Sequence, residues 1–173
     1  MPLFGSHLSI AGGFVNAVYA AERLGCQTLQ IFTSAPRVWP VRSVPPTKKA
    51  SPLSKNDKPT ASEEARLFRR AARRARLRFP MAHDSYLINL ASPDDRLYRR
   101  SVEAFVIEIE RAELLGLRYL VMHPGAHVDS GEEAGLARVA AALDEVHARC
   151  PRFRLRVLLE TTAGQGSCLG HRF

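Results

Sequence analysis

Cysteine, aromatic side chains and long apolar runs are all scarce in this sequence. Only three of its 173 residues are cysteines, 8% are aromatic, and there is a single tryptophan. Cys26, Cys150 and Cys168 lie far apart and form no CxxC pair, which excludes a disulfide framework and indicates a reducing compartment. No run of about 18 apolar residues could span a membrane, and the segment after Met1 lacks the basic and apolar regions of a signal peptide. We therefore expect a cytoplasmic protein with no membrane partner.

Positively charged residues outnumber negatively charged ones in this sequence. Lys and Arg number 25 against 17 Asp and Glu, which gives a formal net charge of +8 and a pI of about 10.0. Such a charge favours polyanionic partners, nucleic acid first. A generally basic, arginine-rich proteome would produce the same balance, so charge alone does not choose between these interpretations. With 46% hydrophobic residues, the chain can form the core of one domain.

Short apolar runs alternate with longer amphipathic segments along the chain. The expected strands cover residues 3–9, 28–33, 79–83, 119–123 and 154–160. Helices are expected from Gly12 to Leu24, from near Ser62, from Ser92 with Pro93 at its first position, and after a capping box of Ser130 and Glu133. Gly25 and Gly116 suit the ends of the first and third helices. Strands separated by helices indicate parallel pairing with right-handed crossovers.

Residues 40–61 interrupt this alternation. They hold five of the 11 prolines and show no apolar period, so we expect a flexible loop. The helix that follows has one apolar face, and arginine covers the other at positions 66, 69, 70, 73, 74 and 76. A solvated helix face is the first interpretation of these arginines, and a DNA contact is the second.

Polar side chains stand at the carboxyl end of each expected strand. They are His7 and Ser9, Thr33, His83, His123 and Glu160. Functional groups at the carboxyl ends of parallel strands are typical of a (β/α)₈ barrel. Five strands and four helices make this an α/β fold of incomplete barrel type, with residues 1–173 as one domain. A doubly wound sheet is the alternative, but no glycine-rich phosphate loop follows the first strand in the usual pattern.

Three of these residues could share a metal ion. Two imidazoles and a carboxylate, from His83, His123 and Glu160, can hold zinc and leave a position open. Bound zinc lowers the pKa of a water molecule to about 7. Taken singly, each of the three fits equally an ordinary polar residue at a strand end, and only their succession on neighbouring strands favours the metal.

Five stretches, in order along the chain, carry a family resemblance. They are GSHLSIAGG at residues 5–13, QIFT at 30–33 followed by Arg37 and Trp39, HDSYLINL at 83–90, HPGAH at 123–127, and LETTAGQG at 159–166 followed by Gly170 and Phe173. This sequence resembles the endonuclease IV family of apurinic/apyrimidinic endonucleases, also called deoxyribonuclease IV. The Pro-rich segment and the arginine-rich helix do not match closely.

The resemblance implies a xylose-isomerase-like TIM barrel with three zinc ions, which hydrolyses the phosphodiester 5′ to abasic sites in double-stranded DNA for base excision repair. It implies that His83 and His123 bind one zinc and that Glu160, the catalytic residue, bridges that zinc to a second. It further implies that Arg37 and Tyr86 enter the DNA and help to hold the abasic nucleotide flipped out. His7 matches a residue lining the barrel mouth, with no assigned role.

The residues themselves also allow simpler interpretations. Arg37 could form a salt bridge in its loop or a cation–π contact with Trp39. The ring of Tyr86 could pack against the next helix, and His127 could serve mainly to shape its loop. The loop at 34–36 also differs from the more polar loop usual in the family.

The family continues with three more strands that carry the remaining zinc ligands. We therefore expect at most one complete zinc site in this chain, impaired activity, and a marginal, aggregation-prone fold with exposed edge strands, unless a partner chain completes the barrel. Two other functions stay open: a non-catalytic half barrel that binds zinc and DNA, and a sugar isomerase-like barrel. The stretches at 83–90 and 163–166 favour the nuclease over the isomerase.

Overall fold

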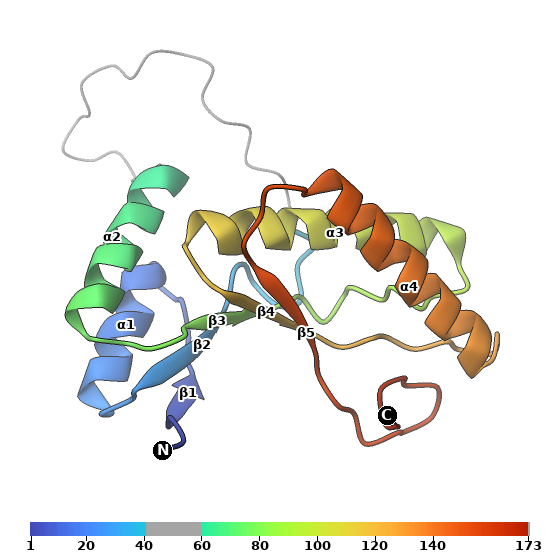
Figure 1. Ribbon diagram of the computed structural model, residues 1–173, viewed down its shortest axis with the longest axis horizontal. Coiled ribbons are helices and arrows are strands. Elements are labelled where there is room, and N and C mark those ends of the chain that lie inside the picture. The colour runs from blue at the N-terminus through green and yellow to red at the C-terminus, as the bar shows by residue number, and fades with distance from the viewer. Residues whose placement is uncertain (41–59, 173) are drawn as a thin grey trace, which may run out of the picture.

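The computed structural model describes residues 1–40 and 60–172, and strands and helices alternate within them (Figure 1). The strands are β1 (Gly5–His7), β2 (Thr28–Phe32), β3 (Met81–His83), β4 (Tyr119–Met122) and β5 (Arg156–Leu159). The helices are α1 (Phe14–Arg23), α2 (Ala61–Arg74), α3 (Asp95–Leu114) and α4 (Glu132–Arg149).

The five strands form one parallel sheet in the order β1-β2-β3-β4-β5. Each strand therefore pairs with its neighbours in the sequence, and β1 and β5 form the two edges. This arrangement confirms the expected incomplete barrel. Because all strands run the same way, their carboxyl ends meet along one edge of the sheet, where the candidate residues lie.

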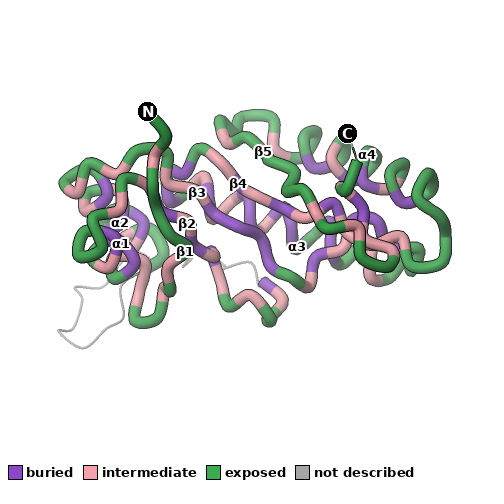
Figure 2. Tube along the Cα trace, turned by 90° about the horizontal axis from the view of Figure 1, so that it is seen from below, coloured by how far each residue is buried: buried purple, intermediate pink, exposed green. Residues whose placement is uncertain are grey.

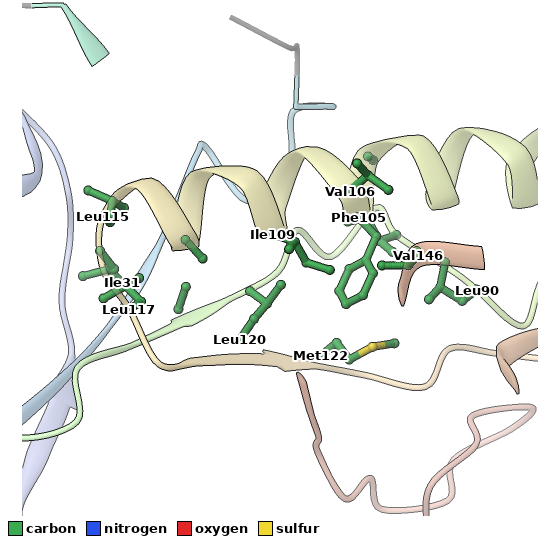
Figure 3. Close-up of a cluster of buried hydrophobic side chains, with 14 of the residues drawn as sticks. Ile31, Leu90, Phe105, Val106, Ile109, Leu115, Leu117, Leu120, Met122 and Val146 are labelled. Carbon is green, nitrogen blue, oxygen red and sulfur yellow. The ribbon is translucent and has the colours of Figure 1, made fainter. Parts of the chain in front are cut away.

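Alternate strand residues pack against the helices and form the core. Leu29 and Ile31 of β2, Ala82 of β3, and Leu120 and Met122 of β4 are almost completely buried. Figure 3 shows α3 lying over this face, with side chains from the helix meeting those from the sheet. The helix side of this cluster includes Phe105, Val106, Ile109 and Leu115. Burial of this one face fixes the register of the sheet.

The edge strands are much less covered than the central ones (Figure 2). All three residues of β1 are exposed, and in β5 Leu158 and Leu159 are 39% and 55% exposed. By contrast, Ala82 and Leu120 of the central strands are 0% exposed. Among the described residues, no helix is both long and apolar enough to cross a membrane.

Two glycines end helices as expected. Gly25 and Gly116 have φ angles of 68° and 72°, a left-handed conformation that favours glycine. In each case the next residue donates its N–H to a carbonyl five positions earlier, as in a Schellman motif. Helix α2 ends in the same way, but Arg76, with φ 55°, occupies the glycine position.

The structure shows which residues cap the second and third helices. Thr60 caps α2 in a capping box with Glu63, and the helix begins at Ala61, next to the expected start near Ser62. Residues 41–59 of the expected loop at 40–61 lie outside the described residues. Asp94, rather than Ser92, caps α3 through the N–H of Leu97. These differences arise because several neighbouring polar residues can cap a helix, and packing decides among them.

The expected capping box of the fourth helix does not form. Gly131 precedes α4 and supplies no side-chain cap. Ser130 instead donates its hydroxyl to the carbonyl oxygen of His127, within the preceding loop. The third strand also begins later than expected, at Met81, because Phe79 has a positive φ of 51° that an extended strand does not allow.

Candidate metal centre

Three neighbouring strands bring the expected ligands together. His83 is the last residue of β3, and His123 and Glu160 directly follow β4 and β5. The ladder continues past the ends of β4 and β5, since the N–H of Glu160 donates to the carbonyl of Met122 at 2.9 Å. Parallel pairing in this register therefore places all three side chains at the same edge of the sheet.

The donor atoms of these side chains are close enough to share one ion. His83 Nε2 lies 2.8 Å from Glu160 Oε2, and His123 Nε2 lies 3.9 Å from the same oxygen. One ligand atom from each residue lies within 4.8 Å of the others. His83 is buried, whereas the side chains of His123 and Glu160 are 38% and 44% exposed. The three-ligand group is thus buried on the His83 side and accessible to solvent on the side of His123 and Glu160.

Both nitrogens of the His83 ring face acceptors. Nδ1 lies 2.9 Å from the carbonyl oxygen of Asp84, which can only accept, so Nδ1 carries a proton. Nε2 faces the carboxylate of Glu160. Two acceptor atoms at this distance need a proton or a metal cation between them. A hydrogen bond from the distal ring nitrogen to a carbonyl is the usual way in which proteins orient a metal-binding imidazole.

The second imidazole has an unsatisfied atom. Nδ1 of His123 is buried and has no hydrogen-bond partner among the described residues. Buried polar groups of this kind are normally paired with protein, water or an ion. This nitrogen is not the one that faces Glu160, so the fit to a metal ion rests on the donor set: two imidazoles and one carboxylate are ligands that zinc accepts.

Two further carboxyl groups lie buried beneath the centre. Burial, together with the nearby carboxylates of Glu108 and Glu160, raises the pKa of Asp84 well above its usual value. Burial likewise raises the pKa of Glu108, although hydrogen bonds from Thr33 and Ser34 oppose the shift. Both carboxyl groups are at most 2% exposed. A buried carboxyl group costs stability, so their presence near His83 marks this end of the sheet as unusual.

The loops that carry the candidate ligands are joined by hydrogen bonds. The Asn89 amide donates to the carbonyl of Ala126 at 2.9 Å, and its oxygen accepts the N–H of Ala126 at 3.0 Å. Asn89 therefore connects the loop after His83 to the loop after His123. Ala126 also forms a β-bridge with Cys168, which ties in the segment after Glu160.

Comparison with known proteins places the fold in a family. The model of the xylose isomerase-like TIM barrel family matches residues 18–173. The chain belongs to this family. Within it, the chain is 44% identical over 173 residues to "Probable endonuclease 4" of Chloroflexus aurantiacus, a match that covers 100% of this chain and 55% of that relative. A protein of the same name from Citrifermentans bemidjiense is 40% identical over the same length, with 56% of it covered.

Solved structures agree with these relatives. Endonuclease IV from Thermus thermophilus superposes with a TM-score of 0.75 at 32% identity, covering 99% of this chain and 56% of that one. A xylose isomerase domain protein from Planctomyces limnophilus gives 0.59 at 14% identity, with 92% and 55% covered, which supports the fold alone. The resemblance to endonuclease IV seen in the motifs is thus confirmed, and the chain spans about half the length of the relatives it matches.

The other residues singled out from the sequence surround the three candidate ligands. Tyr86 is 58% exposed, and its ring lies 5.3 Å from that of Phe32, 5.7 Å from that of His83 and 6.4 Å from that of His123. Its ring therefore lies close to the rings of Phe32 and of the two candidate histidine ligands. The ring of His7 lies 4.4 Å from that of Phe32, whose ring in turn lies 5.7 Å from that of His83.

Arg37 is exposed in the loop after β2. The interpretation of Arg37 as a cation–π partner of Trp39 is wrong. The guanidinium that lies over the Trp39 ring, at 4.2 Å from its centre, belongs to Arg100 of α3. His127 has a buried Nδ1 with no hydrogen-bond partner among the described residues and is not part of the three-ligand group.

The role of Glu108 was not predicted from the sequence. Glu108 lies three residues after Phe105 and four before Ala112, on the apolar face of α3, where a carboxylate is out of place. That interruption of the apolar stripe was the available signal. The two hydroxyl partners lie about 75 residues away in the sequence, at the end of β2, and only the fold reveals them.

Proposed function

We propose that this chain is part of a zinc-dependent DNA repair endonuclease of the endonuclease IV type, which hydrolyses the phosphodiester 5′ to abasic sites in double-stranded DNA. The observation that carries the proposal is the convergence of His83, His123 and Glu160 on one point at the carboxyl edge of the sheet. The identity of 40–44% with proteins named endonuclease 4 supports phosphodiester hydrolysis as the reaction at this site.

His83 and His123 would hold one zinc, with Glu160 as the third ligand and the catalytic residue. Zinc, when bound, supplies positive charge for phosphate oxygens and lowers the pKa of a water molecule. His83 serves as the fixed ligand, because it is buried and its Nδ1 is held by the Asp84 carbonyl. Glu160 is partly exposed and can contact a second ion or substrate. In the relatives, further zinc ions would need ligands beyond the part that this chain matches.

Arg37 and Tyr86 would contact the DNA. Both side chains are exposed on loops that flank the candidate ligands, and the Pro36 carbonyl joins these loops by accepting the Tyr86 N–H at 3.2 Å. An exposed aromatic ring and an exposed guanidinium on two joined loops suit a nucleotide displaced from the duplex. The net charge of +8 adds attraction to the phosphate backbone.

A cleavage assay on a duplex with one abasic site tests this function. We expect incision only on the 5′ side of the lesion, loss of incision after chelation, and recovery with zinc. Glu160→Gln should abolish incision while leaving the melting temperature nearly unchanged, because the side chain is partly exposed. Incision of undamaged DNA at the same rate, or incision that persists in the variant, would contradict the proposal.

A non-catalytic half barrel that binds zinc and abasic DNA is the second candidate. The observation that favours it is that the three-ligand group is the one metal-binding cluster found among the described residues. Tight binding of the lesion without incision at any zinc concentration would support this candidate. Addition of a polypeptide matching the remaining half of the Thermus thermophilus enzyme would then test whether a partner chain restores incision.

A sugar isomerase-like activity is the third candidate. The sugar-epimerase structures that resemble this chain are 13–16% identical to it, far below the endonuclease relatives. Assay of the same preparation with ketose sugars separates this candidate from the other two.

A further inference from the structure

Glu108 is a buried carboxylate on a helix face that otherwise packs apolar side chains. It lies on α3, 1% exposed, and its neighbours on that face include Phe105 and Ala112, which are fully buried. Burial of a carboxylate in such a place costs more than burial of an apolar side chain of the same size. Packing of the core therefore does not explain why a glutamate occupies position 108.

Both oxygens of Glu108 bind the segment that leaves β2. Oε2 accepts the hydroxyl of Thr33, and Oε1 accepts the hydroxyl of Ser34 at 3.0 Å. Thr33 is the residue directly after β2, so the two bonds fix the point at which the loop begins. Inside a protein such hydrogen bonds are electrostatically stronger than in water.

The other end of this loop is also held by α3. The ring of Trp39 packs against the core, and the guanidinium of Arg100 lies 4.2 Å above it. Between the two ends, the Pro36 carbonyl accepts the hydroxyl of Ser85 at 2.9 Å and the N–H of Tyr86 at 3.2 Å. The loop is thus attached to α3 at both ends and to the loop after His83 in the middle.

We propose that Glu108 is a positioning residue: it holds the loop of residues 33–39, so that the loop carrying Arg37 stays joined to the loop carrying Tyr86 at the edge of the metal centre. Its consequence for DNA rests on the proposed function, whereas the positioning itself does not. The hydroxyls give direction as well as attachment, because two acceptors on one carboxylate fix the orientation of two successive residues. An apolar side chain at position 108 fills the space but makes neither bond.

Trp39 provides a direct measurement, because it is the single tryptophan of the chain and lies in this loop. Three variants are compared: Glu108→Leu, Glu108→Gln, and Glu113→Leu as a control. Glu113 lies on the same helix and also accepts hydrogen bonds, from the backbone N–H groups of Arg154 and Leu155, which precede β5 and are not part of the loop. Acrylamide quenching of Trp39 fluorescence is measured in the folded state of each, together with the melting temperature.

We expect Glu108→Leu to increase quenching and to shift the emission to longer wavelength, while Glu108→Gln, which can still bind both hydroxyls, stays close to the wild type. Glu113→Leu should change the melting temperature alone. Affinity for a duplex with a tetrahydrofuran abasic analogue should fall by about tenfold to a hundredfold in Glu108→Leu, the range seen when supporting contacts of a site are lost, and recover in Glu108→Gln.

Unchanged quenching in folded Glu108→Leu overturns the positioning role, whether or not the chain binds DNA. Increased quenching in both Glu108→Leu and Glu113→Leu also overturns it, since the effect is then one of general destabilisation. Increased quenching in Glu108→Leu alone supports the role. If the wild type does not bind the abasic duplex, that result counts against the proposed function and leaves the Trp39 result to decide the role of Glu108.

Discussion

The two ends of the central strands are built differently. At the carboxyl end, polar groups are buried and hydrogen-bonded: His83 to Asp84 and Glu160, and Glu108 to two hydroxyls. At the amino end, Phe79 is 40% exposed, with the guanidinium groups of Arg78 and Arg118 lying 5.6 and 6.0 Å from its ring. Titratable groups are thus buried at one end, whereas charged groups are solvated at the other.

This difference indicates where selection for function outweighs stability. Buried carboxylates and imidazoles destabilise a fold unless a partner compensates for their desolvation. Solvated arginines over an aromatic ring cost little and contribute little. Substitutions at the carboxyl end should therefore act mainly on ion and DNA binding, and those at the amino end on stability alone.

The largest effect is expected for His83→Ala. This change removes the buried, oriented ligand, so we expect zinc affinity to fall by more than about a hundredfold, beyond the loss typical of outer-shell partners. Competition with a chromophoric chelator measures the affinity. His147→Ala, at an exposed position of α4, is the matched control and should bind zinc like the wild type. Equal affinity in both variants would contradict the assigned site.

Asn89→Ala should have a smaller effect at the same end. The amide joins the loops after His83 and His123, so its loss lets the two imidazoles move apart, and zinc affinity should fall by about tenfold. Asn16→Ala is the control, because Asn16 also donates to a backbone carbonyl but lies in α1, outside the centre. A loss of the same size in both would mean that the effect is not local.

Glu108→Gln should change how stability depends on pH. Burial raises the pKa of Glu108, so the folded state binds a proton more tightly than the unfolded state. The free energy of unfolding of the wild type therefore falls as pH rises from about 4.3, the ordinary value of a glutamate, through the raised folded-state value. Glutamine does not titrate, so the variant should show a shallower fall. Denaturant titrations across pH 4–8, in the presence of chelator, test this prediction, and an unchanged slope would contradict it.

The smallest effect is expected at the amino end, where Arg76 occupies the left-handed position after α2. Arg76→Gly should stabilise the fold by about 0.5–1 kcal/mol, because glycine adopts this conformation without strain. Arg70→Gly, the same change at an exposed position inside α2, should destabilise it by about 1 kcal/mol. Neither should alter zinc affinity. Thermal melting measures the change in stability of both variants. Melting temperatures that shift in the same direction in Arg76→Gly and Arg70→Gly would contradict this prediction.

Much of this architecture could be predicted from the sequence, because short apolar runs alternate with longer amphipathic segments along the chain. Gly25 and Gly116 marked helix ends correctly, since only glycine adopts that conformation freely. Helix starts were less certain, because Thr60, Ser62, Ser92 and Asp94 can all cap, and the choice depends on tertiary packing.

The candidate ligands could also be found in advance, because a parallel sheet puts successive strand ends side by side. The contacts beneath them could not. Glu108 and Ser34, or Asn89 and Ala126, are 74 and 37 residues apart, and no local pattern relates them. Nor did the sequence reveal that Arg100, and not Arg37, stacks on Trp39.

The central claim is that two imidazoles and one carboxylate hold a single zinc ion, and X-ray absorption at the zinc edge tests it most directly. With one equivalent of zinc, the account predicts nitrogen and oxygen scatterers at about 2.0–2.2 Å, an imidazole pattern that weakens in His83→Ala, and no sulfur. A sulfur shell at about 2.3 Å, which would assign the ion to cysteine, or a spectrum unchanged by His83→Ala, would contradict it.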